Sequence, residues 1–186
     1  MGTVVPVPKG KDVGGAFQKI PLCHSATQLG CLITFASFRS TVPPPANTLF
    51  GKVTEPNMVA ACTNPAALAG GSGELHAYRS NNGRTITGTT KPKPWVTPEV
   101  AIDTPFVSTP GLLSAKYTSN DDASGYLEIT VNGNPPGPRV NDIVGDLGVG
   151  ANVLANWSLH LVDVNLAMGN LVDIVAAESK AYAAKK

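Results

Sequence analysis

Apolar residues near the end of the chain recur at three- and four-residue spacing, the pattern of an amphipathic helix that packs one face against a core. Acidic and amide side chains lie at the start of this stretch and lysines at its end, the order that the helix dipole favours. Gly169 weakens the predicted helix, because a glycine in a helix interior costs about 1 kcal/mol relative to alanine. The stripe is Leu161, Val164, Met168, Leu171 and Val175, with Asp163 and Asn165 at its start and Lys180, Lys185 and Lys186 at its end.

Alternation of apolar and polar residues is clearest over residues 113–118 and 126–131. Such alternation predicts strands that present one face to a core and the other to the surface. The polar, glycine-containing stretch 120–125 connects them. The pattern therefore predicts an antiparallel hairpin.

Shorter apolar stretches predict further strands. Residues 32–38 are apolar with little alternation, which indicates a strand buried on both faces. Residues 58–62 form a second stretch of this kind. Residues 4–7 predict a short strand that ends at Pro8.

Residues 66–107 carry the fewest signals of regular structure. They include a flexible glycine run at 70–73 and an extended Lys-Pro-Lys-Pro linker at 91–94. A loop of this length in a compact domain is usually functional, for example a lid, and the alternative is a surface excursion with no role. A glycine-spaced loop over 139–156 then leads to His160.

Length and composition indicate one folded domain, residues 1–186, long enough to bury a core. The chain is 42% hydrophobic and 15% charged, which is typical of globular rather than disordered proteins. Its formal net charge is +1, and no basic run occurs before the terminal lysines, so the electrostatic footprint of nucleic-acid binding is missing. No apolar run reaches the length of a transmembrane helix.

The cysteines allow two interpretations. Cys23 and Cys31 are separated by a short polar loop and could close a small disulfide, which suits an exported protein and leaves Cys62 without a partner. Three reduced cysteines in a cytoplasmic protein are the alternative. Residues 1–9 lack the features of a signal peptide and are typical of the end of a strand, so we expect an N-terminal portion to be missing.

Common cofactor and metal motifs are not found in the sequence. The three histidines stand far apart, no Cys-x-x-Cys occurs, and the glycine run is neither a Walker loop nor a dinucleotide fingerprint. We therefore predict no cofactor and no metal site. A serine nucleophile normally lies in the motif Gly-x-Ser-x-Gly. The most similar stretch surrounds Ser25, but it lacks the glycines, so Ser25 is better explained as a loop serine.

His160 is the strongest candidate for chemistry. It lies where a loop leads into the last helix, the place of the catalytic histidine in α/β-hydrolases, where it would accept and return the serine proton. The alternative is a histidine that only caps the helix or fills a polar niche. Its acid partner stays open: Asp163 follows one turn later, Asp12 follows the first strand, and Asp103 and Asp142 lie in loops.

Several blocks of the sequence have a specific order and spacing: residues 20–23 with 30–31, residues 37–39 with 44–47, residues 62–68, and residues 159–167. Together they resemble a bacterial family of uncharacterised α/β-hydrolase-like proteins with members described as esterase- or lysophospholipase-like. The resemblance covers roughly residues 3 to 183. It implies an α/β fold, namely the C-terminal portion of a hydrolase-like sheet with an antiparallel hairpin, long Gly/Pro loops and a C-terminal helix.

The resemblance also implies roles. His160 would be the triad histidine, and the nucleophile elbow, with the first strands, would precede the counterpart of Met1. The family appears exported or periplasmic, which fits a disulfide. The first hypothesis is therefore the C-terminal part of a serine ester hydrolase, inactive alone, acting on a small-molecule or lipid ester and prone to associate through an exposed sheet edge.

Two other hypotheses remain. The chain could be a non-catalytic binding or structural module derived from a hydrolase, with a ligand in the long Gly/Pro loop. It could also be a complete hydrolase that uses an unconventional nucleophile such as Ser25.

Overall fold

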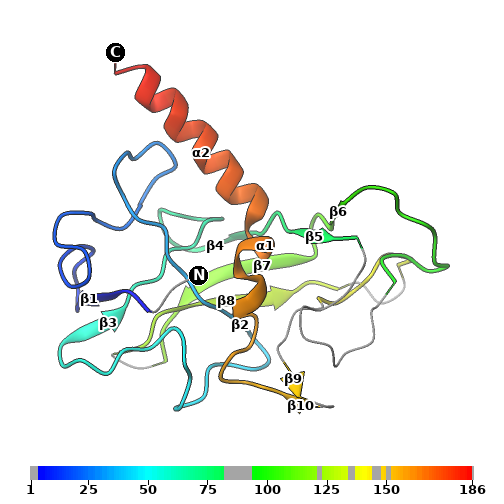
Figure 1. Cartoon of the computed structure of the whole chain (residues 1–186), viewed down its shortest axis with the longest axis horizontal. Coiled ribbons are helices and arrows are strands. Elements are labelled where there is room, and N and C mark those ends of the chain that lie inside the picture. Colours follow the sequence, from blue (N-terminus) through cyan, green and yellow to red (C-terminus); the bar gives the residue numbers. More distant parts are fainter. Residues whose placement is uncertain are drawn as a thin grey trace.

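The computed structural model describes residues 4–81, 94–120, 123–133, 137–143, 148–149 and 152–185. It is a mixed α/β structure, mostly strands, with several small sheets and two α-helices (Figure 1). Parts of the sequence predictions lie outside the described residues. These parts are residues 82–93 of the region 66–107, which include the Lys-Pro-Lys part of the linker, residues 121–122 of the hairpin connection, residues 144–147 and 150–151 of the glycine-spaced loop, and Lys186.

The central sheet has four strands in the order β2-β8-β7-β4. Strands β7 (Leu113–Thr118) and β8 (Tyr126–Val131) pair antiparallel from Leu113 opposite Val131 to Thr118 opposite Tyr126, which confirms the predicted hairpin. Strand β2 (Ser37–Arg39) is parallel to β8, and β4 (Ser72–Glu74) is antiparallel to β7. The predicted strand over 32–38 is therefore shorter and later than its apolar run.

Three two-stranded ribbons accompany this sheet. Strand β1 (Pro6–Pro8) pairs with β3 (Met58–Ala60), β5 (Tyr78–Ser80) with β6 (Phe106–Ser108), and β9 (Gly148–Val149) with β10 (Asn152–Val153), all antiparallel. Strands β4 and β5 lie within the region 66–107 that the sequence indicates as least regular, and β6 begins in it, so that expectation is wrong for these residues.

The main core lies on the inner face of the hairpin. Alternation within β7 and β8 turns their apolar side chains to one side, where they meet residues from the segment that precedes α2. Burying such side chains contributes about 25 cal/mol for each Å² of apolar surface removed from water. The buried residues of this cluster include Leu75, Leu112, Leu113, Ala115, Leu127, Ile129, Leu159, Leu166 and Ala167.

The C-terminal segment is not one continuous helix. A 3₁₀ turn η1 (His160–Val162) and a short helix α1 (Asp163–Leu166) precede α2 (Met168–Ala183), and the break at Ala167 bends the axis by 54°. This break shifts the helical register, so the predicted stripe is wrong in part: Val164 and Val175 are exposed, whereas Leu166 and Ile174 are buried. Helix α2 projects away from the body of the molecule (Figure 1). Among the described residues, no single helix has both the length and the apolar character needed to cross a membrane.

Polar groups at both edges of the central sheet are bonded to the C-terminal segment. At β2, the Ser37 amide donates to Asp163 Oδ1 (2.8 Å) and its carbonyl accepts from the Leu159 amide (3.3 Å). At β4, the Asn170 side chain accepts from the His76 amide (2.8 Å) and donates to the Glu74 carbonyl (3.1 Å). These contacts satisfy backbone groups that would otherwise offer a template for another strand. Association of the chain through a sheet edge stays a prediction.

Candidate active site

His160 lies at the end of a tight turn. The amides of Trp157 and Ser158 both donate to the Leu154 carbonyl, and the His160 amide donates to the Trp157 carbonyl. Ser158 has a φ of 42°, in the left-handed region that few non-glycine residues adopt. Leu159 is fully buried in the core next to it. The turn and its buried leucine together fix the position of the imidazole.

The imidazole of His160 is paired with the carboxyl group of Asp163. His160 Nδ1 and Asp163 Oδ2 are 2.7 Å apart, and the two side chains are 11% and 5% exposed. The three-residue spacing on a helical segment places them on one face. Burial raises the pKa of Asp163, while the hydrogen bonds from His160 and Ser37 oppose that rise. When Asp163 is ionised, its carboxylate accepts both bonds, which selects the imidazole tautomer with the proton on Nδ1 and the lone pair on Nε2.

Aromatic rings hold the imidazole in place. The Phe50 ring stacks on His160 with centroids 3.6 Å apart and planes inclined by 21°. Trp157 in turn meets Phe50 edge to face, with centroids 5.1 Å apart. Within the described part of the chain, His160 Nε2 has no hydrogen-bond partner. The hydrogen bond at Nδ1 and the stacked Phe50 ring therefore orient the imidazole, and Nε2 is available to bind a substrate or another group.

Two pockets meet at His160 and Phe50. One, of about 280 Å³, is lined mainly by apolar residues of the segment 32–36 and by Phe17, and it contains Asp163. The other, of about 570 Å³, extends past Trp157. A buried imidazole between apolar pockets is an arrangement in which a bound carbonyl compound could meet a general base.

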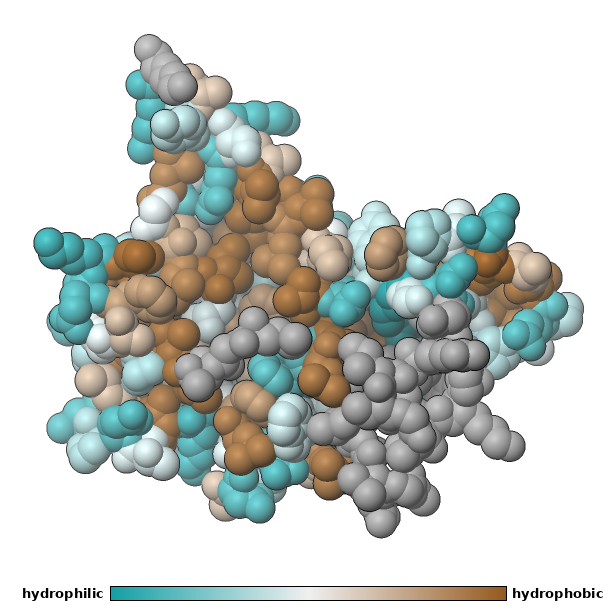
Figure 2. All heavy atoms as spheres, in the orientation of Figure 1, coloured by the Kyte–Doolittle hydropathy of each residue, from teal (hydrophilic) through white to brown (hydrophobic). Residues whose placement is uncertain are grey.

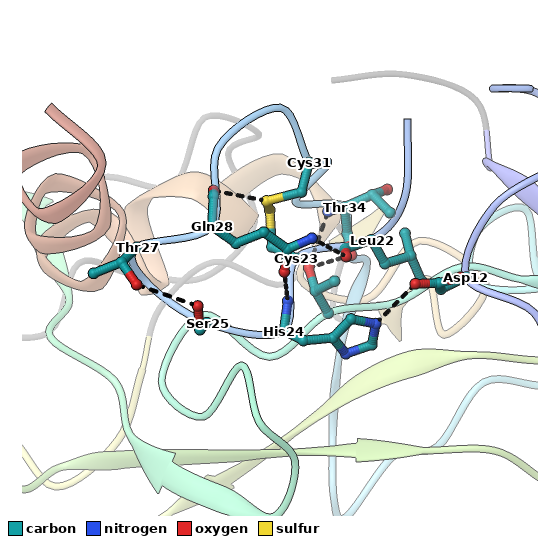
Figure 3. Close-up of a disulfide and its surroundings, with 10 residues drawn as sticks. Asp12, Leu22, Cys23, His24, Ser25, Thr27, Gln28, Cys31 and Thr34 are labelled. Carbon is teal, nitrogen blue, oxygen red and sulfur yellow. Dashed lines mark hydrogen bonds and ion pairs between the residues drawn. A yellow bond between two sulfur atoms is a disulfide. The ribbon is translucent and has the colours of Figure 1, made fainter. Parts of the chain in front are cut away.

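Asp12 lies elsewhere. Its Oδ2 is 3.1 Å from His24 Nε2 in an exposed pair beside the disulfide (Figure 3). Asp142 binds Arg39 (2.9 Å), and Asp103 is exposed. Of the acids considered from the sequence, the structure brings only Asp163 into contact with His160.

None of the described serines is hydrogen-bonded to His160. Ser25 is exposed in the disulfide loop, where its Oγ is 3.5 Å from Thr27 Oγ1 (Figure 3). The hydroxyl groups of Ser37 and Ser158 are buried without a hydrogen-bond partner. Sequence reasoning missed Phe50 and Ser37 as neighbours of the pair, because each is more than 100 residues away and no local pattern marks it.

Cys23 and Cys31 form a disulfide, which confirms that prediction, and Cys62 is free (Figure 3). In the portion of the chain that is described, one group of side chains has metal-ligand spacing: the two disulfide sulfurs and Glu178. Metals bind thiolates, and these sulfurs are bonded to each other, so the group does not fit a metal.

No family model matches this sequence, and comparisons with curated proteins and with solved structures find no match for the chain. The function of this chain is therefore inferred from the geometry around His160.

Proposed function

We propose that His160 and Asp163 are the base and acid of a serine ester hydrolase, and that this chain is the C-terminal part of its α/β-hydrolase-like domain. The observation that carries the proposal is the 2.7 Å contact between His160 Nδ1 and Asp163 Oδ2 in a buried setting that leaves Nε2 available. The α/β-hydrolase-like arrangement comes from the resemblance: His160 precedes the last helix, as in that arrangement, whereas Asp163 follows the histidine instead of preceding it. The substrate is an ester of a small acyl compound or a lipid, as the resemblance implies.

In this proposal the two residues divide the proton chemistry. Asp163 holds Nδ1–H, which fixes the tautomer and stabilises the imidazolium when it forms. Nε2 accepts the proton of an alcohol as its oxygen attacks the ester carbonyl, and then returns that proton to the leaving alkoxide. The serine that supplies the alcohol lies outside this chain, as the resemblance implies, so the isolated chain is expected to lack covalent acyl-enzyme chemistry.

The test separates base catalysis from covalent catalysis. Release of p-nitrophenolate from p-nitrophenyl butyrate is measured in buffer with and without added methanol, beside labelling with a fluorophosphonate probe. We expect no serine labelling, together with a methanol-dependent rate that His160→Gln and Asp163→Asn abolish. His24→Gln is the matched control, because it alters an exposed imidazole–carboxylate pair.

Two results would contradict the proposal. A rate unchanged in His160→Gln would remove the histidine from the chemistry. A serine labelled in a His160-dependent manner would show that the nucleophile lies in this chain, which would favour a complete hydrolase.

A second candidate, a non-catalytic binding or structural module, is favoured by a specific observation. Asp163 also bonds the Ser37 amide, and Phe50 covers one face of His160, so the pair ties the C-terminal segment to β2. Under this alternative, His160→Gln lowers the free energy of unfolding and leaves ester cleavage at the background rate of the unmodified chain.

A further inference from the structure

A third pocket lies along the region 72–80, away from His160. Burial alternates along this extended segment: Leu75, Ala77 and Arg79 are buried, whereas Glu74, His76 and Tyr78 are exposed. Successive side chains of an extended strand point to opposite faces, so the three exposed residues form one surface. All three line a pocket of about 540 Å³ that shares no residue with the pockets at His160.

The opposite wall of this pocket is the first part of helix α2. Met168, Val172 and Asp173 line it, and Val172 is 60% exposed. Helix and strand approach closely because Gly169 has no side chain; a Cβ there would lie 2.6 Å from His76 Cβ and 3.1 Å from Tyr78 Cε2. Figure 2 shows apolar surface that continues from α2 onto the body of the molecule.

Two aromatic residues line this pocket on the side of β6. Tyr78 pairs with Ser108 in the β5–β6 ribbon, which puts Phe106 diagonally across from Tyr78 on the same face. Both rings are accessible, with exposed fractions of 43% for Tyr78 and 53% for Phe106. Their accessible π faces are negative and attract a cation that lies over them.

The charges on this pocket are acidic. Its lining contains the carboxylates of Glu74 and Asp173 and no lysine or arginine. Glu74 is held in place by the amide of Gly111, and Asp173 Oδ2 lies 3.8 Å from His76 Nδ1. The two carboxylates therefore lie beside an apolar, aromatic-lined space, one on β4 and one on α2.

We propose that this pocket binds a small, free organic cation, a quaternary or protonated amine that carries an apolar body. The ammonium group would lie between the aromatic rings and the carboxylates, and the apolar body would lie against Met168 and Val172. Aromatic rings with nearby carboxylates are the general means by which proteins recognise quaternary ammonium groups. The volume of about 540 Å³ suits a molecule of that size.

The test compares three probes of similar shape by isothermal titration of the purified chain: benzyltrimethylammonium, benzyl alcohol and benzoate. We expect the cation to bind, the alcohol to bind several-fold more weakly, and the benzoate not to bind. Asp173→Asn and Tyr78→Leu should each weaken binding of the cation about 2- to 5-fold, the range for an exposed charge or cation–π contact. Glu178→Gln is the control, because it removes a carboxylate from the same helix outside the pocket.

Several outcomes would overturn the proposal. Equal affinities for benzyl alcohol and the cation would show an apolar groove without charge preference. Equal effects of Asp173→Asn and Glu178→Gln would place the cation outside this pocket. Binding to phosphatidylcholine vesicles without binding of the free cation would identify a lipid surface as the partner, and a concentration-dependent dimer that excludes the probe would identify a second copy of the chain. Circular dichroism checks that each variant is folded; the Asp173 side chain is 74% exposed, and Tyr78→Leu keeps an apolar side chain at the partly exposed position 78, so we expect no loss of structure.

Discussion

The backbone amide of Ser37 donates a hydrogen bond to Asp163 Oδ1 at 2.8 Å, across 126 residues of sequence. The same carboxylate binds His160 through its other oxygen. One buried side chain therefore closes the edge of strand β2 and orients the imidazole. Because the Asp163 carboxylate makes both contacts, it couples the stability of the fold to the geometry of the candidate site.

Asp163→Asn should destabilise the fold. The amide has one acceptor and one donor group, so it cannot accept from both the Ser37 amide and His160 Nδ1–H. Either one buried donor is left unsatisfied, or His160 moves its proton to Nε2 and accepts from the amide at Nδ1; both outcomes remove charge-assisted hydrogen bonds, which costs about 1–3 kcal/mol of the free energy of unfolding. Urea unfolding measures this loss, with Asp103→Asn as the exposed control. Equal stability of the two variants would mean that the carboxylate is not needed at β2.

The stability of the protein should also depend on pH through Asp163. Burial raises the pKa of this carboxyl group above its ordinary value of 3.8. The unfolded chain therefore loses this proton first, and the Asp163 contribution to the free energy of unfolding falls as pH rises from about 3.8 to the higher pKa of the folded state, then stays level. The difference between the unmodified chain and Asp163→Asn, measured in urea at a series of pH values, isolates this contribution. A difference that grows with pH over that range would contradict the sign.

Local patterns in the sequence predicted the parts of the fold that depend on near neighbours. The β7–β8 hairpin follows from two strictly alternating stretches, and the disulfide from two cysteines across a short loop. The C-terminal helix was harder to predict. The break at Ala167 changes the helical register, and no proline or pair of glycines marks this break in the sequence. Strand β4 was missed because it begins within the glycine run 70–73, and β5 because its buried position is occupied by Arg79 between the exposed Tyr78 and Ser80.

In the candidate site, too, local relationships could be predicted from the sequence and long-range contacts could not. The sequence placed Asp163 one helical turn after His160 among several possible acids, and the contact between the two side chains is seen only in the structure. Asp12 could not be resolved that way, since its contact with His24 depends on how the N-terminal loops fold. The stacking of Phe50 on His160 joins residues 110 positions apart by sequence numbering, and only the tertiary structure reveals it.

Gly169→Ala should destabilise the protein although alanine favours helices. The added Cβ would lie 2.6 Å from His76 Cβ and 2.9 Å from the His76 carbonyl oxygen, so backbone has to move. Overpacking of this kind costs about 1–3 kcal/mol, which exceeds the gain of about 1 kcal/mol from helix propensity. Thermal unfolding measures the net effect, with the exposed Ser179→Ala as a helix control expected to be neutral or slightly stabilising. A gain in stability for Gly169→Ala would show that α2 and the segment at His76 are further apart.

Cys62 should resist alkylation while the protein is folded. Its thiol is enclosed although the residue as a whole is partly exposed, and burial, assisted by the Asp163 charge, raises its pKa well above the ordinary range for cysteine. The reactive species is the thiolate, so iodoacetamide at pH 8 should add nothing to the native chain, one group after unfolding and three after reduction. Mass spectrometry counts the adducts. Rapid modification of the native chain would contradict the enclosed thiol, and three adducts without reduction would contradict the disulfide.

Arg79 should be replaceable by methionine with a gain in stability. The residue is 6% exposed, its three side-chain nitrogens have no hydrogen-bond partner among the described residues, and its guanidinium carbon lies 4.5 Å from the centroid of the Trp95 ring. Burial lowers the pKa of Arg79 to about 10, and the charge of Asp142 opposes this shift only in part, so Arg79 stays charged at neutral pH and keeps a net desolvation cost.

Arg79→Met keeps much of the volume and removes the charge. Replacing buried charges by apolar groups has stabilised other proteins by about 1–4 kcal/mol. Loss of the cation–π contact with Trp95 removes about 1 kcal/mol of that gain. We therefore expect a net gain in urea unfolding at pH 7. Arg79→Lys should bring no gain, since it keeps the charge and loses the planar stacking. The exposed Arg139→Met is the control, expected within about 0.5 kcal/mol of the unmodified chain. A loss of more than that in Arg79→Met would show that the guanidinium has a binding partner in solution.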